Sequence, residues 1–330
     1  MTAALALFGY ALAVAWSLPP LLARLTARGV SVRLGLAAWL VAMVSAVVSA
    51  GLGLVFLFRT LRADWPSLTR LLCRSVAGNA CTPVVYRSGL YELGVAAVAI
   101  LVTLTAAVAL WRYGRRLRRA QRSTRQHAEA ALIVGRPLPG TGAVVLADPR
   151  PAAYCVPGGP GRPAAIVLTS GALAVLDGSQ LGAVLAHERA HLAGRHHAVV
   201  LLTRGLAAVL PGVPLFSRGA AEVARLAEMS ADDRAARTAG RATLVAALLA
   251  IATGAAVPAL VHPGQALPGQ ALPGLALPRA GLAAATYAVP ARVERMLTPP
   301  GPARHTAFAL ALAAVLISLI LVPAALTAVV

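Results

Sequence analysis

The sequence predicts a mainly α-helical membrane protein, with about four transmembrane helices and an α+β domain outside the membrane. The chain of 330 residues is 58% hydrophobic and has a mean hydropathy of +0.75, which is too apolar for a soluble domain. Four apolar runs are long enough to cross a bilayer, which takes about 20 residues. They are residues 3–23, 34–58, 93–111 and 306–330. The stretch between the third and fourth runs mixes strand-like and helix-like segments, and it therefore predicts the α+β domain.

These runs divide the chain into three parts. We expect residues 1–112 to form a three-helix transmembrane region, residues 113–304 the separate domain, and residues 305–330 a C-terminal transmembrane helix. The first run is expected to be a retained anchor and not a cleaved signal peptide. No basic residue precedes it, whereas a signal peptide carries its positive charge in front.

Arginines dominate the charge, because 30 basic and 11 acidic residues give a net charge of +19. Such a basic chain could bind nucleic acid. The lipid bilayer is the better partner, because seven arginines crowd behind the third apolar run, as in a cytoplasmic membrane flank. They are Arg112, Arg115, Arg116, Arg118, Arg119, Arg122 and Arg125. We therefore expect a multi-pass protein of the plasma membrane with a cytoplasmic domain and no nucleic-acid partner. Loop 59–92 would lie outside, where Cys73 and Cys81 form a disulfide or stay free thiols.

Within the separate domain, two short runs predict β-strands, at 143–148 and 164–169, with a loop rich in Pro and Gly between them. A helix is expected from Asp177 or Ser179, as its cap, to about Arg195. A second helix is expected over 224–240. The apolar stretches 198–216 and 242–261 are ambiguous, because a buried helix, a membrane-surface helix or a span would look alike. Proline at every fifth residue of 263–278 predicts a loop.

The motif that carries chemistry is H-E-x-x-H, formed by His187, Glu188 and His191. Residues four apart lie on one face of a helix, so both imidazoles can bind one cation. This spacing predicts one catalytic Zn²⁺, with Glu188 beside the metal as the base that takes a proton from the zinc-bound water. The apolar residues around the motif predict a buried helix, in which histidines need partners.

Two residues compete for the place of third zinc ligand. His197 completes the metzincin pattern H-E-x-x-H-x-x-G-x-x-H with Gly194. Glu228 lies on the later predicted helix, one turn before Asp232. That pair would supply one ligand and one carboxylate that orients a ligating imidazole, as zinc sites commonly require.

The segment "VLAHERAHLAGRHH", followed by "AEMSADDRAA", resembles the integral-membrane gluzincin peptidases. These include the HtpX-like and CAAX-prenyl proteases and the BlaR/MecR-type transducers. The resemblance implies a zincin-like metalloprotease domain, with Glu228 as third ligand and Asp232 behind the ligands. It also implies an edge strand, before the active-site helix, that pairs with extended substrate backbone. The penicillin-binding sensor of the antibiotic receptors is not expected, because the chain ends just after its last span.

The expected function is that of a membrane-bound zinc endopeptidase, which cuts protein or peptide substrates in regulatory or quality-control proteolysis. One alternative is a metzincin-like protease on a membrane anchor, with His197 as third ligand. The other is a catalytically silent membrane sensor, scaffold or transporter with a structural metal site. If Glu228 joins His187 and His191, residues 198–216 cannot cross the membrane, because a crossing would separate the ligands.

Overall fold

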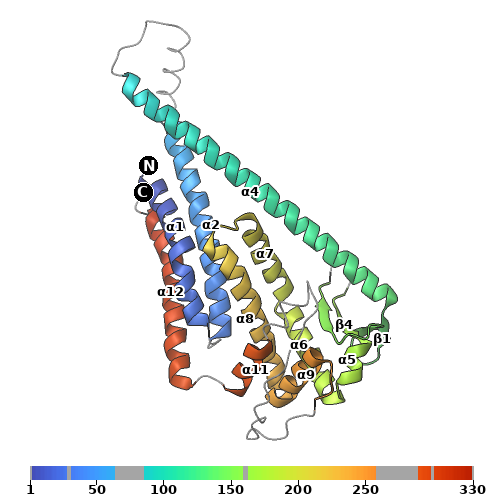
Figure 1. Cartoon of the computed structure of the whole chain (residues 1–330). Coiled ribbons are helices and arrows are strands. Elements are labelled where there is room, and N and C mark those ends of the chain that lie inside the picture. The colour runs from blue at the N-terminus through green and yellow to red at the C-terminus, as the bar shows by residue number, and fades with distance from the viewer. Residues whose placement is uncertain are drawn as a thin grey trace.

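The computed structural model describes residues 2–27, 31–63, 85–158, 163–257, 289–298 and 301–328. It consists mostly of helices, with one small mixed sheet (Figure 1). The predicted loop 263–278 and the open question of Cys73 and Cys81 lie outside the described residues.

Four helices of the described part contain a segment long and apolar enough to cross a membrane, which indicates a membrane protein. They are α1 (Thr2–Thr26), α2 (Val32–Ala63), α4 (Val85–Val134) and α12 (Pro302–Ala328). Helices α1, α2 and α12 lie side by side, with both chain ends at the same end of the bundle (Figure 1). Buried side chains such as Leu22, Trp39 and Leu312 form their shared core. The four predicted apolar runs are therefore confirmed as helices.

Helix α4 is longer than the predicted span, because it contains the third apolar run and the arginine-rich stretch in one helix of 50 residues. At 1.5 Å per residue it is about 75 Å long, more than twice the hydrocarbon thickness of a bilayer. The segment is rich in Ala, Leu and Arg, which favour helix, and no proline interrupts it. It begins at Val85, and α2 extends to Ala63, so the predicted loop 59–92 is helical at both ends.

The sheet has four strands in the order β1-β2-β4-β3. Strands β2 (Ala143–Leu146) and β4 (Ala165–Thr169) are parallel and correspond to the two predicted strands. Strands β1 (Arg136–Leu138) and β3 (Ala153–Val156) pair antiparallel to them at the two edges. The strand-like runs alone did not predict β3, which lies in the expected loop, but the resemblance implied an edge strand before the active-site helix. Strand β3 is short and is flanked by prolines, which sheets tolerate at their edges.

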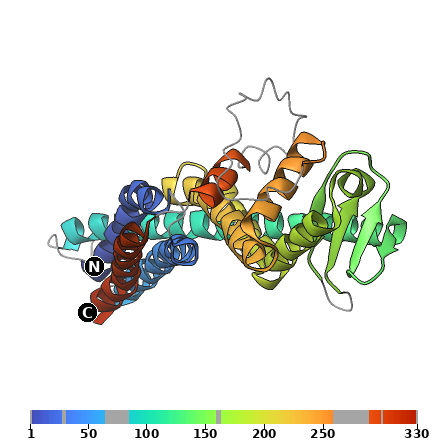
Figure 2. The ribbon, with the colours of Figure 1, turned by 90° about the horizontal axis from the view of Figure 1, so that it is seen from below.

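Six further helices of the described part follow the sheet along the chain: α5 (Ser170–Val175), α6 (Gly178–Ala193), α7 (His196–Val209), α8 (Pro214–Ala239), α9 (Arg241–Thr253) and α11 (Val289–Leu297). In Figure 2 the transmembrane bundle and the sheet lie at opposite ends, with α8 and α9 between them. Helix α6 packs against α8 and α9, and the sheet packs against α6.

The two ambiguous apolar stretches are short helices. The first becomes α7, whose 14 residues are about 21 Å long and too short to cross, and after a turn at 210–213 the chain returns as α8. The second becomes α9, whose 13 residues include the buried Leu244, Val245 and Ala247. Helix α9 is thus a core helix of the domain.

Helix α8 belongs to both parts of the molecule. Its first half packs in the transmembrane bundle through Leu215, Phe216 and Val223. Arg225 fixes this arrangement, because its guanidinium donates a 2.8 Å hydrogen bond to the carbonyl of Thr26 at the end of α1. The second half of α8 lies against α6. A single helix therefore connects the bundle to the predicted site residues.

Candidate metal centre

Helix α6 carries the H-E-x-x-H motif and begins at the predicted cap. The Asp177 carboxylate accepts 2.8 Å hydrogen bonds from the backbone N–H groups of Ser179 and Gln180, while the Gln180 side chain accepts one from the backbone of Asp177. The Gln180 amide also donates 2.6 Å to the carbonyl of Val257. This capping box satisfies donors that a helix start leaves unpaired, and so holds the first turn in place.

Two histidines of α6 and one glutamate of α8 converge on one point. The Nε2 atoms of His187 and His191 are 3.1 Å apart. Each of them is 3.5 Å from a different carboxylate oxygen of Glu228. These three residues form a group whose possible ligand atoms all lie within 4.8 Å of one another. The structure therefore brings together the two predicted histidines and the acidic candidate for third ligand.

Asp232 lies behind this group, one helical turn after Glu228. Its Oδ1 atom is 3.2 Å from Nδ1 of His187, the ring nitrogen that faces away from Glu228. The distance suits a hydrogen bond, although the angle between the two groups does not, which leaves Nδ1 of His187 without a partner. The Asp232 side chain is only 1% exposed. It is therefore placed where a small rotation of the His187 ring would complete the bond.

Arg292 of α11 is a site residue that the sequence did not predict. Its side chain is 4% exposed and donates two hydrogen bonds to Asp232, at 2.6 and 2.7 Å. A third guanidinium nitrogen lies 3.2 Å from Glu228. The sequence does point to such a cation, because Glu228 and Asp232 are four residues apart on one helix. Two carboxylates that are buried together need a positively charged partner. Which of the many arginines supplies it depends on the tertiary fold.

The charges of this cluster shift the pKa values of its members. Burial alone would lower the pKa of His187, but the nearby carboxylates of Asp232 and Glu228 outweigh it and raise the pKa to about 9. Burial raises the pKa of both carboxylates, yet their charged partners dominate. His187 and His191 hold the pKa of Glu228 well below its usual value, and Arg292 lowers the pKa of Asp232. Both acids are thus ionised at neutral pH.

His196 at the start of α7 is the second residue of the site that the sequence did not single out. It is buried, and its Nδ1 atom is 3.1 Å from Nδ1 of His191. Burial, together with the charge of His191, lowers its pKa to about 4, so His196 is neutral at pH 7. It can then accept a hydrogen bond from Nδ1–H of His191 and orient that ring.

The glycine of the metzincin-like pattern has a structural explanation. A side chain on Gly194 would collide with the His196 ring, so glycine leaves room for that imidazole. The next residue, Arg195, has a φ of 48°, and this left-handed turn separates α6 from α7. His197, the last residue of the pattern, is exposed and does not belong to the group of possible ligands.

Glu188 is buried on α6 and is not a member of the ligand group among the described residues. Its carboxylate lies close to Cys155 on the edge strand β3. Burial and this neighbouring charge raise the pKa of Cys155 to about 12, so the thiol stays protonated. Glu188 therefore faces the side of the site on which β3 lies, next to the ligand group but separate from it.

The donor set fits a zinc ion. Zinc in catalytic sites takes three protein ligands from nitrogen and oxygen donors, with one position left open. Here two imidazole nitrogens and one carboxylate converge, and a second carboxylate lies behind one imidazole. Such an arrangement could bind a cation and place an unligated carboxylate, Glu188, beside it.

Comparison with known proteins supports a metallopeptidase. Residues 117–211 match the family model described as Peptidase family M48. The matched segment runs from the arginine-rich part of α4 through the sheet and α6 to the end of α7, so it contains His187, Glu188 and His191 but not Glu228. No curated protein and no solved structure matches the chain. The family match, together with the ligand group, indicates a metallopeptidase.

Proposed function

We propose that this chain is a membrane-bound zinc endopeptidase with a zincin-like domain, and that His187, His191 and Glu228 hold the metal. The observation that carries the proposal is the convergence of these three side chains from α6 and α8. Asp232 on the far side of His187 supports it, because a carboxylate behind a ligating imidazole fixes its tautomer and orientation. His196 serves His191 in the same way.

Zinc bound there would supply a Lewis acid, which polarises a peptide carbonyl and makes water a nucleophile near neutral pH. Glu188 has the role of general base. It accepts the proton of the attacking water and then passes it to the nitrogen of the leaving amine. The burial of Glu188 keeps that proton transfer away from bulk water.

Substrate would lie along β3. This strand is at the edge of the sheet, so its outer side has no strand partner among the described residues. It lies against α6, and Cys155 in its middle is close to Glu188. A peptide that adds to this edge as a further strand would bring an extended backbone next to the general base.

The substrates are proteins or peptides, and the setting is regulatory or quality-control proteolysis at a plasma membrane. The charge pattern supports a cytoplasmic domain, because seven arginines of α4 directly follow its apolar part. The metzincin-like alternative would require His197 in the ligand group. Its exposed position, and the use of Gly194 to accommodate His196, favour Glu228 instead. A silent scaffold would not need a glutamate at position 188.

The proposal is tested by the variant Glu188→Gln, purified as full-length protein in detergent. We expect it to bind zinc like the wild type and to lose casein or autolytic cleavage by at least about a hundredfold, because only the general base is removed. His197→Ala is the matched control and should keep both properties. Cleavage at the wild-type rate by Glu188→Gln would contradict the proposed mechanism.

A further inference from the structure

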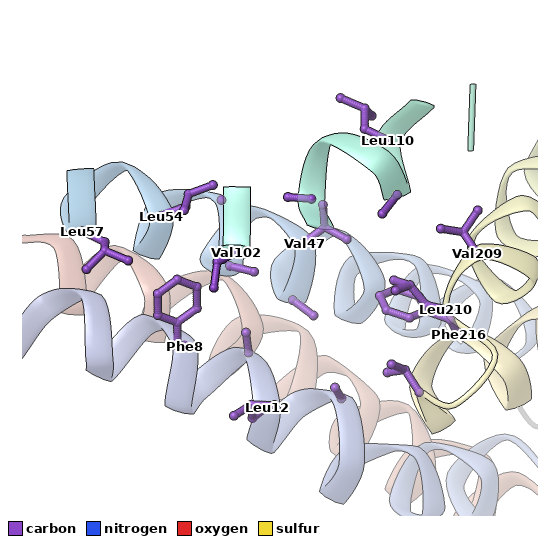
Figure 3. A pocket seen from close by; sticks show the side chains of 18 of the residues that line it. Phe8, Leu12, Val47, Leu54, Leu57, Val102, Leu110, Val209, Leu210 and Phe216 are labelled. Carbon is purple, nitrogen blue, oxygen red and sulfur yellow. The ribbon is translucent and has the colours of Figure 1, made fainter. Parts of the chain in front are cut away.

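A large apolar cavity lies away from the candidate metal centre, between α4 and the transmembrane bundle. Its volume is about 1230 Å³, above the roughly 300–1,000 Å³ of common small-molecule sites. Figure 3 shows side chains of α1, α2, α4 and of the α7–α8 turn around it, among them Phe8, Val47, Val102 and Leu210. On α4 the lining residues recur at spacings of three or four and form a stripe along one face. They include Val98, Val102, Ala106, Ala109 and Tyr113.

A second cavity, of about 790 Å³, lies between α4 and α7 and is strongly basic. Five arginines line it: Arg112, Arg115, Arg116, Arg119 and Arg204. No acidic residue lines it, and none of the five forms an ion pair in the part of the chain that the structure describes. Like charges gathered without counter-charges repel one another, so this cavity favours an anionic occupant.

The two cavities adjoin each other. Tyr113 borders the apolar cavity, and its ring packs on Gly205, which borders the basic cavity. The Tyr113 hydroxyl also donates a 3.4 Å hydrogen bond to the carbonyl of Leu202 on α7. The apolar cavity therefore meets the cationic cavity where Tyr113 of α4 packs against α7.

We propose that an anionic phospholipid binds here, with its phosphate among the five arginines and its acyl chains in the apolar cavity. The apolar stretch of α4 that lines the cavity runs from Gly94 to Leu110 and is about 24 Å long, enough for an acyl chain to extend the roughly 15 Å of one leaflet. Trp111 follows directly, at the depth where tryptophan marks a membrane interface, and Arg115 stacks 5.3 Å from its ring. Basic pockets between membrane helices recognise anionic head groups by the same chemistry.

A transmembrane segment of a substrate is the competing occupant, and charge decides against it. The cytoplasmic ends of membrane helices carry an excess of Lys and Arg. Such an end would meet the five arginines and be repelled, whereas a lipid phosphate would be attracted. The apolar cavity lies among helices that are long and apolar enough to cross a bilayer, where lipid chains would surround it.

The test uses the full-length protein in a neutral detergent, titrated with dioleoyl phosphatidylglycerol while native mass spectrometry counts the bound lipid. Phosphatidylcholine and inorganic phosphate are titrated in parallel. Each basic residue near an anionic lipid contributes roughly a fivefold gain in binding. The triple variant Arg115→Gln, Arg116→Gln, Arg204→Gln should therefore bind phosphatidylglycerol on the order of a hundredfold more weakly. Ala106→Trp should weaken it as well, because the indole fills the space of the acyl chains.

The matched control is Arg118→Gln, Arg122→Gln, Arg125→Gln, which removes the same charge from α4 outside the cavity. It should bind phosphatidylglycerol like the wild type. Equal weakening by both triple variants would overturn the proposal in favour of diffuse electrostatic attraction. Saturation by inorganic phosphate at the same concentration would contradict the proposal, because it would show a site for the phosphate group alone. Equal affinity for phosphatidylcholine would contradict the proposal as well. Displacement of the lipid by an apolar peptide helix with a basic end would favour a substrate segment.

Discussion

Glu228 and Asp232 are two of only 11 acidic residues in a chain with 30 arginines, and both lie in the candidate metal centre. Their ionisation depends on neighbours. Arg292 bonds to both carboxylates, and His187 lies between them. A bound divalent cation would replace the proton of His187 as the positive charge that faces Glu228. At the scale of single residues, we therefore expect His187 to carry a proton in the metal-free site.

Replacement of the His187 proton by the metal predicts that zinc binding releases a proton. The pKa of His187 is raised to about 9, so in the metal-free protein the ring is protonated at pH 7 and must lose its proton to become a ligand. We expect about one proton to be released at pH 7, and the zinc affinity to fall about tenfold per unit as the pH drops from 8 to 6. As the pH rises through 9 the release should disappear. Calorimetric titration in buffers of different ionisation enthalpy measures it.

The control for this prediction is Asp232→Asn, which removes a carboxylate that holds the proton on His187. The pKa of His187 should fall, and proton release at pH 7 should shrink. A zinc affinity that does not depend on pH between 6 and 8 would contradict the account.

At the scale of elements, helices and caps were the most predictable features. The four apolar runs, the start of α6 at Asp177 and the two inner strands follow from local sequence. The face shared by Glu228 and Asp232 also follows from their spacing of four. The roles of Arg292 and His196 depend on packing between segments, because Arg292 lies 60 residues after Asp232 in sequence. Strand β3 is held by its pairing with β4, and its own sequence has no clear strand pattern.

Helix α11 should depend on Arg292 for its attachment to α8. In Arg292→Leu the buried Asp232 loses its cation, so we expect the free energy of unfolding to fall by about 3 kcal/mol and the melting temperature by roughly 6–12 °C. Arg295→Leu is the matched control on the same helix. Its partner Asp233 is 39% exposed, so the loss should stay below about 1 kcal/mol. Thermal melting of the metal-free proteins compares them, and equal losses would argue against a special role for Arg292.

At the scale of the whole molecule, α8 connects the transmembrane bundle to the metal centre. Gly219 allows the close contact, because a side chain there would meet Met43 and come within 3.0 Å of Trp39 on α2. Glu228 lies nine residues further along the same helix. The position of the site therefore depends on how the helix is seated in the bundle.

Gly219→Leu should displace α8 and disturb the site without touching it. Overpacking of this kind costs about 1–3 kcal/mol. We expect a lower melting temperature together with weaker zinc binding, both measured on the full-length protein in detergent. Gly9→Leu on α1 is the control, because a Cβ added at Gly9 would have no atom of another segment within 4 Å. A lower melting temperature with unchanged zinc affinity would show that the site does not depend on this contact.

The most direct test of the central claim, that α6 and α8 together form one zinc site, is the zinc content of the purified protein and of two variants. We expect about one zinc ion per chain in the wild type and in His197→Ala, and its loss in Glu228→Ala. Zinc retained in Glu228→Ala but lost in His197→Ala would contradict the account.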